Sequence, residues 1–177
     1  MRTAGIDIGS ITAKAAVIED GRILGTKFIF TGYNAEAAGG KVYELLLNET
    51  GLEASSISKI VSTGYGRNSV KFANKSFTEI MAHAAGAYFL DSTIRTLIDI
   101  GGQDSKAVAI GENGRVRNFV MNDKCAAGTG RFLEVMARAL EMNLDEFGAM
   151  SLQSGQPSSI SSLCTVFAES EVISLIS

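Results

Sequence analysis

The residues with the clearest capacity for chemistry are Cys125 and the two glycines that follow it, Gly128 and Gly130. Behind them, apolar residues recur at offsets of 0, 3, 4, 7 and 8 from Phe132 to Leu140, which predicts one face of a helix. A helix N-terminus presents unpaired N–H groups and a dipole that favours negative charge. We expect this position to receive a phosphate, a thiolate or an anionic cluster.

Two other stretches combine acidic residues with glycine in a short turn. The first supplies Asp7, Gly9, Ser10 and Lys14. Gly9 lets backbone N–H groups approach an anion, Ser10 adds a hydroxyl donor, and Lys14 adds a compact charge for phosphate. Asp7 suits a hydrated magnesium ion, which prefers carboxylate and water oxygens. The alternative interpretation is an ordinary hairpin with a surface lysine.

The second turn lies within residues 99–106 and has a similar composition. Gly101 and Gly102 allow the main chain to reach a phosphate, and Asp99 and Asp104 can hold a metal ion or its water. Gln103 is placed to orient an attacking water, as glutamines do in other nucleotide hydrolases. The alternative is a glycine turn flanked by satisfied surface acids.

These turns fall at equivalent points of a duplicated pattern. Strands are predicted over residues 3–8, 13–19, 23–30 and 58–63, with helices over 35–48 and 78–90. The order strand–strand–strand–helix restarts with strands over 96–100, 105–110 and 115–121 and the helix from Phe132. Residues 145–152 and the segment from Thr165 are predicted helices, separated by a loop over 153–162. Two acidic turns at matching positions favour a phosphate clamp over two unrelated hairpins.

Composition and length restrict the class of protein. The chain has 177 residues, enough for one larger or two small domains, and 46% of them are hydrophobic. We place two domains at residues 1–92 and 93–177. A net charge of -3 without a basic run argues against nucleic acid. Apolar runs are too short to span a membrane, and the N-terminus enters a strand pattern without a signal-peptide core, so we expect a cytoplasmic protein.

The chain contains only two cysteines, Cys125 and Cys164. Two cysteines in a cytoplasmic chain argue against a structural disulfide. They are also too few to complete a four-ligand metal site within one chain. Two reduced, buried cysteines are the alternative to a ligand role.

The acidic turns resemble the phosphate motifs of the superfamily that contains acetate and sugar kinases, Hsp70 and actin. Longer strings, at residues 99–106, 122–134 and 164–172, resemble the ATP-dependent activators (component A) of 2-hydroxyacyl-CoA dehydratases. ATPase subunits of benzoyl-CoA reductases are close relatives of that family. The resemblance covers the whole chain. It implies an α/β fold with two ribonuclease-H-like domains facing each other across an ATP cleft.

The resemblance also implies cofactors and partners. Members are homodimers that share one 4Fe–4S cluster, so Cys125 and Cys164 are its expected ligands, two from each chain. ATP with Mg²⁺ drives electron transfer to the dehydratase, and ferredoxin or flavodoxin supplies the electron. By the same resemblance, Asp7, Gln103 and Asp104 are the expected catalytic residues. The expected nucleotide-binding residues are Gly9, Ser10, Lys14, Asp99, Gly101, Gly102, Gly128, Thr129, Gly130 and Glu134.

Other interpretations remain open at this point. Glu134 has two interpretations: it contacts the nucleotide ribose, or it forms an ordinary surface ion pair with Arg138. A small-molecule kinase or a non-enzymatic nucleotide-binding scaffold would share the phosphate turns without needing paired cysteines. Members of the resembling family run on past Ser177 to an adenosine-binding glycine motif and a C-terminal helix. We therefore expect an incomplete second domain and weak or absent ATP hydrolysis from these residues alone.

Overall fold

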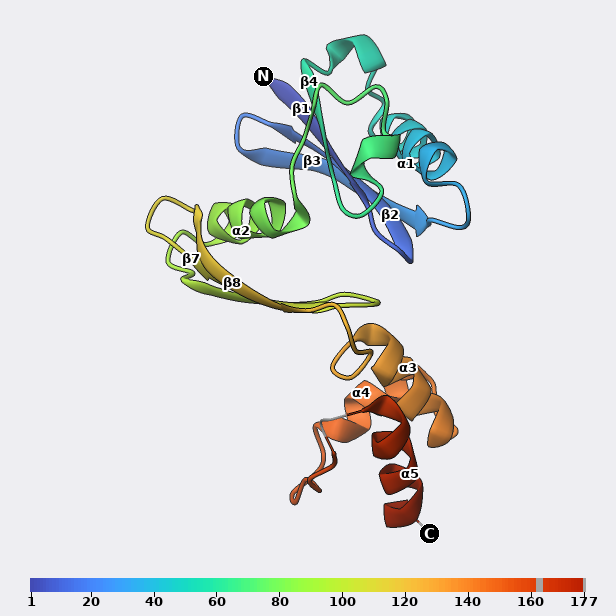
Figure 1. Ribbon diagram of the computed structural model, residues 1–177. Coiled ribbons are helices and arrows are strands. Elements are labelled where there is room, and N and C mark those ends of the chain that lie inside the picture. The colour runs from blue at the N-terminus through green and yellow to red at the C-terminus, as the bar shows by residue number, and fades with distance from the viewer. Residues whose placement is uncertain (162–163, 177) are drawn as a thin grey trace. The chain divides into compact units, whose positions relative to one another are not determined.

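The computed structural model describes residues 1–161 and 164–176 and divides into two compact units (Figure 1). The first comprises Met1–Ile94 with Gly111–Val116, and the second comprises Arg95–Ile110 with Arg117–Ser177. Ser162, which ends the predicted loop, lies outside the described residues. Within the described residues, every helix is too short or too polar to cross a membrane.

The first unit is built on a five-stranded sheet. Its strands are β1 (Arg2–Ile8), β2 (Thr12–Glu19), β3 (Arg22–Phe30), β4 (Lys59–Thr63) and β5 (Lys75–Ser76), in the spatial order β3-β2-β1-β4-β5. The strands β1, β2 and β3 form the predicted antiparallel meander, and β4 runs parallel to β1. Asp20 and Gly21 join β2 to β3 with φ of 47° and 80°, as a tight hairpin turn requires.

Helix α1 (Ala35–Thr50) covers one face of this sheet (Figure 1). Asn34 caps its start by accepting the Ala37 N–H at 3.0 Å, and Gly51 ends it with φ of 67°. The alternating strand residues that face α1 form the core with its apolar stripe. They are Ala4, Ile6, Ile8, Ala13, Ala15 and Val17 from the sheet, and Ala38, Val42, Leu46 and Leu47 from the helix.

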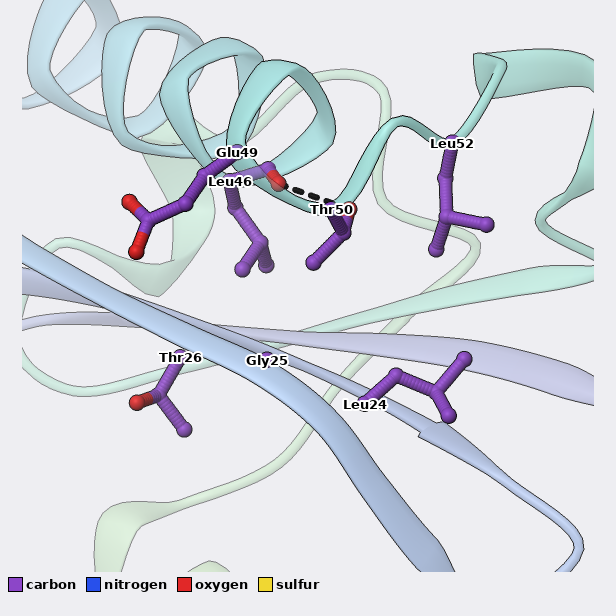
Figure 2. A pocket seen from close by; sticks show the side chains of 7 residues that line it. All are labelled: Leu24, Gly25, Thr26, Leu46, Glu49, Thr50 and Leu52. Carbon is purple, nitrogen blue, oxygen red and sulfur yellow. Dashed lines mark hydrogen bonds between the residues drawn. The ribbon is translucent and has the colours of Figure 1, made fainter.

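The C-terminal turn of α1 comes very close to the edge strand β3. Figure 2 shows Leu46 and Thr50 above Gly25, at a groove of about 460 Å³. A Cβ atom added at Gly25 would collide with the Cγ2 of Thr50, so a larger residue here would have to displace the Thr50 side chain. The Thr50 hydroxyl donates to the Leu46 carbonyl at 2.8 Å, which holds the side chain over the strand.

Three short elements of the first unit have no periodic signal in the sequence. They are the strand β5 and two 3₁₀ turns, η1 (Ala54–Ser56) and η2 (Arg67–Ser69). Helix α2 (Glu79–Leu90) follows them where predicted, capped by Thr78. Its Tyr88 hydroxyl donates to the Glu112 carbonyl at 2.7 Å, which explains why the turn at Gly111–Val116 groups with this unit.

The second unit repeats the beginning of the first with fewer strands. Its sheet has the order β6-β7-β8, with β6 (Thr96–Ile100), β7 (Ser105–Ile110) and β8 (Val116–Asn122). The helices α3 (Gly130–Ala139), α4 (Leu144–Ser151) and α5 (Thr165–Ile176) follow, and α3 packs against both α4 and α5. The predicted strands and helices of this half are therefore confirmed within one or two residues.

Neighbouring glycines in α1 provide a test of this packing. Glycine inside a helix costs about 1 kcal/mol relative to alanine, and a Cβ at Gly40 would meet nothing within 4 Å. We expect Gly40→Ala to stabilise the fold by about 0.5–1 kcal/mol. A Cβ at Gly39 would lie 3.3 Å from both Ile8 and Val70, so Gly39→Ala should show a smaller gain or a loss. Thermal unfolding of both variants measures the difference. Equal gains would contradict the close packing at Gly39.

Candidate functional site

The first acidic turn connects β1 to β2 and is closed by main-chain hydrogen bonding. Asp7 and Lys14 are register partners, and the Lys14 Nζ lies 3.1 Å from the Asp7 Oδ2. The Gly9 N–H donates to the Thr12 carbonyl at 3.0 Å. Ser10 is exposed at the tip, and the Lys14 side chain is 53% exposed. Lysine, hydroxyl and main chain therefore stand together around a solvent-accessible turn, as a phosphate site needs.

A glycine loop after β4 packs against the same turn, and the sequence analysis did not assign it to the site. Gly64 has φ of 84°, and a Cβ there would collide with the Asp7 Oδ1. The Gly66 N–H donates to the Ile8 carbonyl at 2.9 Å. The Gly-Tyr-Gly spacing after a strand was a visible signal, but only the parallel pairing of β1 with β4 brings it to Asp7.

The second acidic turn reproduces this hairpin between β6 and β7. Asp99 and Lys106 are register partners, as Asp7 and Lys14 are in the first turn. The Gly101 N–H donates to the Asp104 carbonyl at 2.8 Å, which corresponds to the bond from Gly9 to Thr12. The predicted duplication of the turns is thus confirmed at the level of register and hydrogen bonding.

Charge is arranged differently in the second turn. The Lys106 Nζ lies 2.9 Å from the Asp104 Oδ1 and 3.2 Å from the Asp99 Oδ2. Lys106 and Asp104 are both buried, whereas Gln103 is exposed. The sequence analysis missed Lys106, although it is the counterpart of Lys14 in the repeat. Burial of Asp104 favours a supporting role within the turn, since its side chain is turned away from solvent.

The loop that carries Cys125 is organised by one side chain. The Asn122 Nδ2 donates to the carbonyls of Cys125 and Ala127 at 2.9 and 3.0 Å. Its Oδ1 accepts the N–H groups of Lys124 and Cys125 at 3.3 and 3.1 Å. The Ala127 N–H in turn donates to the Cys125 Sγ at 3.4 Å. This N–H donor and the bonds from Asn122 fix the position of the sulfur within the loop.

The start of α3 is bonded to the second turn, which corrects one expectation. The sequence predicted unpaired N–H groups at this N-terminus, available to an anion. Instead, the Gly130 N–H donates to the Gly101 carbonyl at 2.8 Å, and the Arg131 N–H donates to the Gly102 carbonyl at 3.1 Å. The Ser105 hydroxyl donates to the Gly128 carbonyl. Gly130 also needs its small size, because a Cβ would lie 3.3 Å from the Gly101 oxygen.

Two predicted nucleotide-binding side chains have local partners. Thr129 is fully buried as the N-cap of α3, where its hydroxyl donates to the Ala126 carbonyl at 2.5 Å and accepts the Phe132 N–H at 3.4 Å. Its side chain therefore supports the loop rather than a ligand. Glu134 forms an exposed ion pair at 2.9 Å with Arg131 instead of the predicted Arg138.

The two cysteines fit the proposed role of cluster ligands in several respects. Both are free thiols and partly buried, and Cys164 stands directly before α5. The described residues contain no group of three or more histidine, cysteine or acidic side chains that could hold a metal ion. The thiols of one chain are therefore too few for a four-ligand cluster, and a second chain would have to supply the rest.

The α/β fold that carries the two equivalent acidic turns is shared with a ROK hexokinase from Thermus thermophilus, at a TM-score of 0.51 and 17% identity. A profile of the BadF/BadG/BcrA/BcrD ATPase family matches residues 4–177, and the chain belongs to this family. This confirms the resemblance found in the sequence.

Individual relatives agree with this assignment. The activator of lactoyl-CoA dehydratase from Anaerotignum propionicum is 49% identical over 100% of this chain and 68% of its own length. A benzoyl-CoA reductase component from Thauera aromatica is less similar, with 35% identity over 99% of this chain and 64% of its own length. The chain thus spans about two thirds of the length of these relatives.

Two solved structures share the fold closely. Component A of Acidaminococcus fermentans (R)-2-hydroxyglutaryl-CoA dehydratase superposes with a TM-score of 0.92 at 41% identity, over 99% of this chain and 68% of that one. The activator of 2-hydroxyisocaproyl-CoA dehydratase from Clostridium difficile, solved with bound ADPNP, has a TM-score of 0.88 at 47% identity, over 99% and 66%.

Removing the side chain that organises the cysteine loop tests this geometry. Asn122→Ala deletes the hydrogen bonds to two carbonyls and two N–H groups, so we expect a loss of about 1–3 kcal/mol in stability and faster labelling of Cys125 by a thiol reagent. The labelling is measured in metal-free protein that carries Cys164→Ser, so that Cys125 is the thiol that reacts with the reagent.

The matched control is Asn113→Ala, because the Asn113 side chain accepts only the Arg115 N–H, at 3.2 Å, among its bonds within the described residues. It should leave the labelling rate of Cys125 unchanged. If Cys125 is labelled at the same rate with and without Asn122→Ala, both in the Cys164→Ser protein, Asn122 does not hold the loop.

Proposed function

We propose that this protein is an ATP-driven electron donor that activates a 2-hydroxyacyl-CoA dehydratase. Membership of the BadF/BadG/BcrA/BcrD family and the names of its relatives support the proposal. The observation that carries it lies in the second unit: the turn with phosphate-binding character is hydrogen-bonded to the helix that follows the Cys125 loop. A nucleotide-responsive element and a redox-ligand loop are thereby joined within one unit.

ATP and Mg²⁺ would be handled by the two acidic turns, in ribonuclease-H-like domains proposed at residues 1–92 and 93–177. In the first turn, the exposed Lys14 and Ser10 bind phosphate oxygens, and Asp7 holds Mg²⁺ through its water shell. In the second, the main-chain N–H of Gly102 approaches the phosphate, because the Gly101 N–H already donates to the Asp104 carbonyl. Gln103 is exposed and orients the attacking water.

Cys125 and Cys164 would hold a 4Fe–4S cluster at the centre of a homodimer. The N–H donor on Cys125 Sγ and the free state of both thiols support this role. When bound, such a cluster supplies a one-electron redox centre whose potential depends on hydrogen bonds to its sulfurs. Ferredoxin or flavodoxin is the proposed reductant in the cytoplasm, and the chain's own residues set the position of the thiolates.

A benzoyl-CoA reductase is the second candidate for the electron acceptor, because a component of such an enzyme is a more distant relative. The ATP-handling residues would be the same, so the two candidates differ in the partner that is docked. Higher identity to the dehydratase activators favours the first.

Anaerobic purification and cysteine substitution test the proposal. We expect a coloured homodimer with about four irons that stimulates a purified 2-hydroxyacyl-CoA dehydratase only when ATP and a reductant are present. Cys125→Ser should abolish the iron and the stimulation while nucleotide affinity, measured by titration calorimetry, stays close to wild type. Cys164→Ser should behave in the same way, since both thiols are ligands.

Two outcomes would contradict the proposal. A colourless monomer after anaerobic reconstitution with iron and sulfide would exclude a shared cluster. Parallel loss of iron and of nucleotide binding in Cys125→Ser, together with a lower melting temperature, would instead show that Cys125 supports the fold.

A further inference from the structure

The two lysines that occupy equivalent positions in the repeated turns lie in opposite environments. The Lys14 side chain is half exposed and contacts one carboxylate, Asp7, at 3.1 Å. The Lys106 side chain is 2% exposed and contacts two carboxylates, Asp104 at 2.9 Å and Asp99 at 3.2 Å. Register pairing is the same in both hairpins, so the difference comes from the residues around each lysine.

The difference has an identifiable source in the turn itself. Asp104 occupies the position that Thr12 holds in the first turn, since each accepts the main-chain bond that closes its hairpin. The Asp104 carboxylate is directed into the turn, and a Cβ at Gly101 would lie 2.5 Å from its Oδ1. A carboxylate placed there has lost its water and requires a compensating cation. The Lys106 ammonium supplies it.

Lys106 also joins two parts of the second turn that the main chain connects only through the glycines. Asp99 lies in β6, before Gly101 and Gly102, whereas Asp104 follows them. The ammonium bonds both, so the two carboxylates are held on opposite ends of the phosphate-binding segment. Asp99 remains the more accessible of the two, with a side chain 21% exposed against 4% for Asp104.

We propose that Lys106 is a positioning residue that fixes Asp99 and Asp104 around the second turn, and that Lys14 alone of the two lysines binds phosphate. The proposal rests on the proposed ATP-hydrolysing function. It gives different roles to Lys14 and Lys106, two lysines at equivalent positions of the repeated turn. Lys106 acts through the carboxylates and through the shape of the turn, whereas Lys14 contacts the nucleotide.

Single-turnover hydrolysis with excess protein tests this division, because it detects even slow reaction. Lys106→Met keeps the length of the side chain and removes its charge. We expect the maximal rate constant to fall by about 10–100-fold, as when residues that orient metal ligands are replaced, with little change in the protein concentration at half-saturation. Lys14→Met is the matched control and should mainly raise the concentration of protein needed for half-saturation.

A double variant separates positioning from folding. Lys106→Met leaves Asp104 buried without this cation, so it should lower the melting temperature, and adding Asp104→Asn should recover most of that loss because a neutral pair replaces a broken ion pair. The hydrolysis rate of the double variant should stay below that of Asp104→Asn alone, since Asp99 remains unfixed. A double variant that hydrolyses ATP as fast as Asp104→Asn alone would show a purely structural lysine and overturn the proposal.

Two further results would contradict the proposed role of Lys106 or the proposed function. If Lys106→Met raises half-saturation as Lys14→Met does and leaves the rate constant unchanged, Lys106 contacts the nucleotide and the proposal is wrong. Absence of both bound iron and dehydratase stimulation in the wild-type protein would count against the proposed function. In that case the melting temperatures still test the ion pair, because failure of Asp104→Asn to recover the stability of Lys106→Met would refute it independently.

Discussion

Main-chain hydrogen bonds between the second acidic turn and the start of α3 are the interaction on which the second unit depends. The amides of Gly130 and Arg131 donate to the carbonyls of Gly101 and Gly102. A helix N-terminus normally leaves such amides to water, to a capping side chain or to a ligand. Here the turn itself accepts them. Because the bonds join main chain to main chain, a displacement of the turn is transmitted directly to the first residues of the helix.

This junction gives ATP-dependent activation a physical route. A ligand shifts a conformational equilibrium only by the difference in its affinity for the two states. Coupling energies of about 1–3 kcal/mol are typical. Two or three neutral hydrogen bonds, at about 1 kcal/mol each, are of that size. The bonds from Gly130 and Arg131, with the hydroxyl bond from Ser105 to Gly128, would supply a coupling of that size if one of the two states broke them.

The repeated hairpins show how one framework accommodates different charge arrangements. Strand register and the closing hydrogen bond are shared, so both lysines project from the same position beside an aspartate. Placing Asp104 where the first turn has Thr12 adds a buried negative charge. Burial of Lys106 follows from it, because an unpaired carboxylate in the interior is costly. The lysine at this position is thus exposed where the turn carries Thr12 and is an internal counter-ion where the turn carries Asp104.

The sequence alone determined the order and approximate limits of the main strands and helices and the equivalence of the two acidic turns, because these depend on periodicity and turn chemistry that are local in the chain. It also identified the family. Only the tertiary structure decided that Lys106 is buried, that Gly64 packs against Asp7, and that the first amides of α3 are consumed by the second turn. The last two depend on segments distant in sequence meeting at one place, which a local pattern does not encode, and the burial of Lys106 depends on how the turn folds around Asp104.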